Sequence, residues 1–128
     1  MNAKLYLTIF AIIAVLYGIA FELIPESVAA LYGAPPDPHV ILNARFFGST
    51  LLALSVIAWF AKDFRDRDAV RGVLIGAAVG DVVGGLVNIW ATIQGLLNGL
   101  AWSSTILYVL LLLGALYCLS TGSKMESK

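Results

Sequence analysis

The sequence predicts an all-α integral membrane protein, a single domain built as a four-helix antiparallel bundle over residues 1–128. Two observations lead to this class. Hydrophobic residues make up 60% of the 128 and charged residues only 12%, whereas a soluble domain has roughly a quarter of its residues charged. Four stretches, apolar on all sides, also have the roughly 20 residues that a helix needs to cross about 30 Å of hydrocarbon: residues 5–24, 40–61, 72–97 and 100–120.

The connections between these stretches are short, so we expect successive helices to run in opposite directions. Residues 98–99 leave room only for a tight hairpin between the third and fourth helices. Between the first and second helices, Pro25 and Gly33 frame a short segment as a helix start and a helix terminator do. We expect this segment to form a short interfacial helix on the outer face of the membrane.

Basic residues fall on one side of this arrangement, apart from Arg45, which lies within a span. Short loops rich in Lys and Arg stay in the cytoplasm, so both termini and residues 62–71 are expected to face inward from the cell (cytoplasmic) membrane. A cleavable signal peptide over residues 5–24 is the alternative, but its apolar run exceeds the roughly 7–15 residues of a signal core. The inner basic residues are Lys4, Lys62, Arg65, Arg67, Arg71, Lys124 and Lys128.

One polar residue from each helix is expected at the same depth in the outer leaflet. Counting ~1.5 Å per residue from the inner ends places all four about 24–26 Å above the inner boundary. Charged groups at such a depth usually turn inward and pair, so Glu22 and Arg45 are predicted to be in direct contact, with Asn88 and Ser104 nearby. This polar layer either joins the helices structurally, which is favoured, or binds a polar headgroup or small ligand from the outer face.

Asp81 lies about 13 Å from the inner boundary, near the middle of the bilayer. No basic residue shares its depth. It is expected either to be protonated and hydrogen-bonded to Ser49, Thr50 or Tyr17, or to be ionised in a hydrated cavity. Because acids inside membranes often mark proton or ion pathways, Asp81 is the candidate proton or ion site.

The third stretch carries four glycines at four-residue intervals, at Gly72, Gly76, Gly80 and Gly84. Small residues with this spacing let membrane helices approach each other closely. They are predicted to form a glycine-zipper packing face, within the bundle or between copies of the chain.

Residues 21–35 read FELIPESVAALYGAP, and residues 44–54 read ARFFGSTLLAL. These two phrases resemble the small four-helix DoxX-like membrane proteins, and the likeness continues through the last two helices only as hydropathy. The resemblance implies a compact four-helix bundle and, in some members, an accessory subunit of a membrane oxidoreductase. It implies no catalytic residue.

Composition and motifs argue against several classes of function. The net charge of zero argues against nucleic-acid binding. With one His and one Cys, the chain is expected to hold no metal and no cofactor. Nucleophile, zinc-protease and phosphate-loop motifs are missing, so catalysis is the least favoured interpretation. The favoured function is an accessory or interaction protein of the lipid bilayer, working as a homo-oligomer or as a subunit of a larger membrane complex. The alternative is a lipid or small-molecule binder or carrier that uses the polar layer and Asp81.

Overall fold

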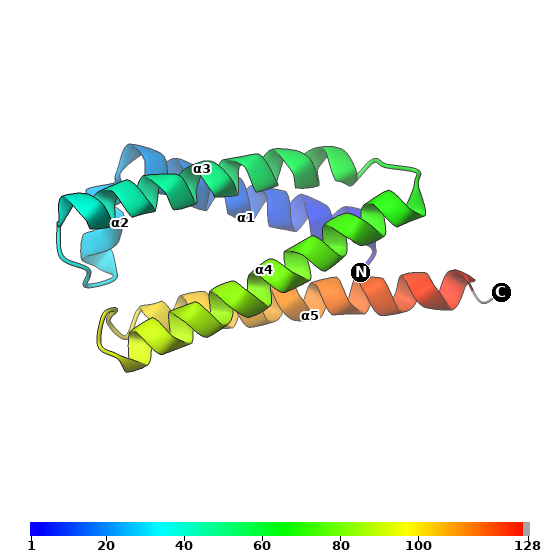
Figure 1. Cartoon of the computed structure of the whole chain (residues 1–128). Helices are drawn as coiled ribbons and strands as arrows, with labels where there is room; N and C mark the ends of the chain where they lie inside the picture. Colours follow the sequence, from blue (N-terminus) through cyan, green and yellow to red (C-terminus); the bar gives the residue numbers. More distant parts are fainter. Residues whose placement is uncertain (127–128) are drawn as a thin grey trace.

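Five α-helices make up the computed structural model, which describes the backbone of residues 1–126 and the side chains of residues 1–122 (Figure 1). Four of these helices are long and apolar enough to cross a membrane, which confirms the predicted all-α class with four candidate spans. In chain order the helices are α1 (Ala3–Leu23), α2 (Pro25–Leu31), α3 (Pro38–Ala61), α4 (Arg67–Ile93) and α5 (Ala101–Glu126).

Side-chain caps determine where three of the long helices begin. The carboxamide or carboxylate oxygens of Asn2, Asp37 and Asp66 accept hydrogen bonds from backbone N–H groups in the first turns of α1, α3 and α4. Such caps satisfy donors that a helix start leaves free. Because Asp66 caps α4, residues 67–71, three of which are charged, are already helical. α4 therefore begins five residues before the predicted span at residue 72.

Glycines in the left-handed conformation end α2 and α4. Gly33 has a φ of 75° and Gly95 a φ of 74°, values that glycine adopts without steric cost. After Gly95, the Leu96 N–H donates to the Ala91 carbonyl at 2.9 Å, which is the closing bond of a Schellman motif. α4 therefore ends four residues before the predicted boundary at residue 97, and its connection to α5 is longer than the predicted hairpin.

The four long helices form two pairs, α1 with α3 and α4 with α5, which converge where α1 begins and diverge toward α2 (Figure 1). Glycines allow α1 and α3 to pack closely. A Cβ atom at Gly48 would lie 3.0 Å from the carbonyl oxygen of Gly18, and one at Gly18 would lie 2.9 Å from the side chain of Leu52. Neither position has room for a larger residue unless the helices move apart.

The core where the two pairs meet consists mainly of small side chains, which lets backbones approach without large hydrophobic groups between them. Large apolar side chains point outward instead: Leu16, Phe46, Leu86 and Leu110 are each at least 60% exposed. A soluble monomer rarely exposes so much apolar surface, whereas lipid solvates it. The core residues are Tyr6, Leu7, Ala11, Ala58, Ala61, Leu74, Ala78, Ala115 and Cys118.

Hydrogen bonds connect the two pairs at the opposite end. The Asn98 backbone N–H donates to the Tyr32 carbonyl at 2.9 Å, and the Asn98 side-chain amide donates to the Leu31 carbonyl at 2.9 Å. The hydroxyls of Tyr32 and Ser104 are 2.8 Å apart. The end of α2 is therefore bonded both to the α4–α5 connection and to α5.

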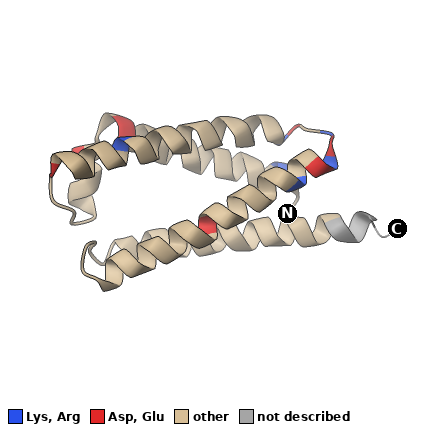
Figure 2. Ribbon diagram, viewed as in Figure 1, with Lys and Arg blue, Asp and Glu red and all other residues tan. Residues whose placement is uncertain are grey.

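Charged residues gather toward the two ends of the long helices, with one acidic residue midway along α4 (Figure 2). The end where α1 begins carries most of the basic residues. The side chains of Lys124 and Lys128, also predicted for that side, lie outside the described residues. The described basic residues at this end are Lys4, Lys62, Arg65, Arg67 and Arg71.

Candidate functional site

The predicted contact between Glu22 and Arg45 is wrong for this structure. Among the described side chains, ion pairs within 4.0 Å join only Lys4 and Lys62 to Asp63. Glu22 lies instead beside Gly48, where an added Cβ would be 3.2 Å from the Glu22 Cγ atom. Arg45 precedes Gly48 by three residues, which turns it about 60° around the helix. Depth counting placed both residues at one level, but it left the direction of each side chain undetermined.

Asn88 and Ser104, the other two members of the predicted layer, are bonded to separate partners. The Asn88 side-chain amide donates to the Ala101 carbonyl and to the Thr105 hydroxyl, both at 2.8 Å, and so joins α4 to α5. Ser104 is bonded to Tyr32. The structure therefore shows no hydrogen bond or ion pair among the four predicted residues, all of which lie in its described part. Thr105 and Tyr32 carried no sequence signal that distinguished them from other polar residues near helix ends.

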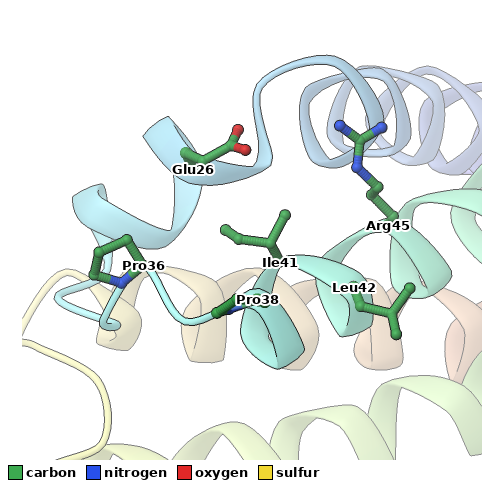
Figure 3. Close-up of a pocket in the computed structure, with 6 residues that line it drawn as sticks. All are labelled: Glu26, Pro36, Pro38, Ile41, Leu42 and Arg45. Carbon is green, nitrogen blue, oxygen red and sulfur yellow. The ribbon is translucent and has the colours of Figure 1, made fainter.

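Arg45 lines an open groove of about 420 Å³ at the end of the molecule that carries α2 (Figure 3). Glu26 projects into the same groove from α2, and an apolar surface lies between the two charges. Within the described part of the chain, the side chains of Arg45 and Glu26 form no ion pair and no hydrogen bond. Sequence reasoning overlooked Glu26 because it searched for polar partners only within the four spans, and Glu26 lies in the predicted interfacial helix. The remaining lining residues are Pro36, Pro38, Ile41 and Leu42.

Asp81 is buried between the helices, with only 5% of its surface exposed. Its Oδ2 atom has no hydrogen-bond partner among the described residues. Two of its predicted partners, Ser49 and Thr50, are exposed on α3 and donate to the Phe46 carbonyl instead. This part of the prediction is wrong because both hydroxyls bond back to their own helix, as Ser and Thr often do.

A tyrosine of α1, Tyr6, contributes a second unpartnered polar group among the described side chains. The Tyr6 hydroxyl is also buried and, among the described residues, has no hydrogen-bond partner. The third predicted partner, Tyr17, does not bond to the Asp81 Oδ2 atom either. Asp81 on α4 and Tyr6 on α1 are thus two buried polar groups, each with unused hydrogen-bonding capacity.

The glycine stripe of α4 divides into two parts. A Cβ at Gly84 would lie 2.8 Å from the ring of Tyr108, so this glycine packs against α5. Gly72, Gly76 and Gly80 meet nothing within 4 Å, so the prediction that they pack inside the bundle is wrong. Four residues advance a helix by about 400°, so each step rotates the stripe by about 40°. Only the last glycine has rotated far enough to face α5.

The opposite end of the molecule holds a cluster of charges outside the apolar stretches. Lys4 Nζ lies 2.9 Å from Asp63 Oδ1, and Lys62 Nζ lies 2.5 Å from Asp63 Oδ2. Hydrogen bonds from Lys4 and Lys62 lower the pKa of Asp63 to about 2. Lys62 also lies over the ring of Trp59, 4.4 Å from its centroid. The cluster connects the start of α1 to the α3–α4 connection.

No group of three His, Cys, Asp or Glu side chains among the described residues is arranged to hold a metal ion. A family model described as "Domain of unknown function (DUF8292)" matches residues 1–120. The chain belongs to this family. No curated protein and no solved structure matches the chain. The DUF8292 match contains Asp81, the α4 glycines and the groove between Glu26 and Arg45.

Proposed function

We propose that the protein is an interaction protein of the cytoplasmic membrane that works as a homo-oligomer or as a subunit of a larger membrane complex. One observation carries the proposal: Gly72, Gly76 and Gly80 leave a strip of α4 that no other described part of the chain covers. Lipid does not drive helices together by hydrophobicity, so close van der Waals contact over small residues is a main source of association. The resemblance to DoxX-like proteins agrees with a subunit role.

Native mass spectrometry from mild detergent tests the proposal. Gly76→Leu should lower the fraction of oligomer or of bound partner, because a branched side chain prevents close approach to the strip, while unfolding of the monomer stays unchanged. Ala53→Leu, at an exposed small residue of α3, is the matched control and should leave assembly intact. A wild-type chain that is monomeric without a co-purifying protein would refute the proposal, as would unchanged assembly of the Gly76 variant.

The proposed topology is an antiparallel bundle with both termini in the cytoplasm and α2 on the outer membrane surface. The basic residues near the start of α1 and in the α3–α4 connection support it through the positive-inside rule. Cysteine labelling in a Cys118→Ala background provides the test. A cysteine at Ser127, which lies outside the described residues, should resist an impermeant reagent added from outside. Labelling of that cysteine in intact cells would show that the proposed orientation is wrong.

A second candidate function is the binding of a proton or a small cation by Asp81. The observation that favours it is the burial of the Asp81 Oδ2 atom without a partner among the described residues. Infrared difference spectroscopy should detect a carboxyl band that responds to pH or to added cation and that disappears in Asp81→Asn. A purely structural carboxyl group would give no responsive band.

A further inference from the structure

The groove between α2 and α3 is lined by residues that neither candidate function above uses. Its floor is apolar, formed by Ile41, Leu42 and two prolines, and its two charged side chains come from different helices (Figure 3). Arg45 belongs to α3 and Glu26 to α2. An occupant of this groove must therefore combine an apolar body with one negative and one positive group.

Arg45 requires a partner that the described chain does not supply. It lies seven residues into α3, about 10 Å along the helix from its start, among exposed apolar side chains such as Leu42 and Phe46. A cation at this depth is costly without a counter-charge. The long Arg45 side chain can extend outward toward the membrane phosphates, and a guanidinium group binds phosphate with several donors at once.

Glu26 supplies the opposite charge nearer the outer end of the groove (Figure 3). From the middle of the membrane outward, the surface of α3 and α2 thus offers the exposed side chain of Phe46, then Arg45, then Glu26. A glycerophospholipid with an amine headgroup has the complementary order of acyl chains, phosphate and ammonium. The lipid matches the groove in the signs of its charges and in the order of its groups along the membrane normal, and this match favours such a lipid as the occupant.

We propose that this groove binds a phospholipid whose headgroup pairs a phosphate with a primary ammonium, as phosphatidylethanolamine does. The phosphate lies against Arg45, and the ammonium donates hydrogen bonds to the Glu26 carboxylate. The acyl chains run from Arg45 toward the middle of the membrane along α3, over Phe46. A choline headgroup has no N–H donor for Glu26, and a glycerol headgroup has no positive charge, so both bind more weakly.

The test is lipid retention by the intact chain, measured by native mass spectrometry from micelles that contain equal amounts of ethanolamine, choline and glycerol phospholipids. The wild type should retain the ethanolamine lipid about tenfold more than the other two, since hydrogen bonds between charged groups are among the stronger polar contacts. Glu26→Gln should abolish this preference while keeping general retention. Arg45→Gln should lower retention of all three lipids severalfold.

Two further variants complete the design. Glu22 is predicted to lie at the level of Arg45 but is outside the groove lining. The Glu22→Gln variant should therefore retain lipid as the wild type does. Arg45→Lys keeps the charge and should retain the ethanolamine lipid at an intermediate level, which gives a reading if Arg45→Gln does not fold. Equal retention of the three lipids by the wild type would overturn the proposal, as would retention unaffected by any change at Glu26 and Arg45. Self-association through α4 is not required for either outcome, so the two proposals fail independently.

Discussion

Replacing Asn88 with leucine removes two hydrogen bonds between α4 and α5 at once. The Asn88 amide donates to the Ala101 carbonyl and to the Thr105 hydroxyl, each at 2.8 Å. Hydrogen bonds between membrane helices stabilise by about 0.6 kcal/mol on average and by up to about 1.7 kcal/mol. Two such bonds therefore predict a loss of roughly 1–3 kcal/mol for Asn88→Leu. The Ala101 carbonyl keeps the Thr105 hydroxyl as a partner at 3.4 Å, which limits the loss.

The assay is reversible unfolding in detergent, with a double-mutant cycle between Asn88→Leu and Thr105→Val. Because the two side chains share one bond, the cycle should give a coupling energy of about 0.6 kcal/mol or more. Val87→Leu, at an exposed position next to Asn88, is the control and should change stability by less than about 0.5 kcal/mol. An Asn88→Leu variant as stable as the wild type would refute the reasoning, and zero coupling would show that Asn88 and Thr105 do not bond.

Three further predictions follow from contacts that differ from the sequence-based expectation. Gly84→Leu should destabilise the monomer by about 1–3 kcal/mol, because its side chain must displace the Tyr108 ring, which lies 2.8 Å from the new Cβ. Gly80→Leu should leave unfolding of the monomer unchanged, and equal effects of the two changes would contradict the division of the glycine stripe. Glu22→Gln and Arg45→Gln should have additive effects on the free energy of unfolding, with any coupling below about 0.5 kcal/mol. A larger coupling would show that the two side chains do pair. The depressed pKa of Asp63 means that its ion pairs favour the folded state above the ordinary carboxyl pKa of 3.8 and are lost as the pH falls toward about 2; an NMR titration of Asp63 should show a midpoint near 2, and a midpoint near 3.8 would exclude the pairing.

Local signals in the sequence were sufficient for the helices but not for every boundary. Pro25 and Gly33 predicted α2 because a ring-restricted φ and a left-handed glycine act on the backbone within one turn. Gly95 acts in the same way at the end of α4. Its signal was missed because the surrounding residues remain apolar as far as Leu97, and hydropathy does not report backbone conformation.

The candidate site was predicted less completely than the fold. Depth along a helix follows from counting residues, and the depth predicted for Asp81 stays a prediction, whereas its burial between the helices is observed. The direction of a side chain around the helix depends on how helices pair, which a single sequence does not specify. For this reason Gly48, and not Arg45, lies beside Glu22, and Arg45 opens onto a groove whose second charge comes from α2.

The two ends of the molecule resist separation of the helix pairs by different means, and this makes the chain mechanically asymmetric. Where α1 begins, a core rich in small side chains keeps the pairs together, and separating them there would expose close-packed backbone along several turns. At the α2 end, the bonds of Asn98 to Tyr32 and Leu31 and the Tyr32–Ser104 contact can break individually. Thermal motion should therefore separate the two helix pairs at the α2 end, while the pairs stay together at the end with the Lys4–Asp63 cluster. Hydrogen exchange should be faster at the Asn98 amide than at the backbone amides of core residues where α1 begins, such as Leu7 and Ala58.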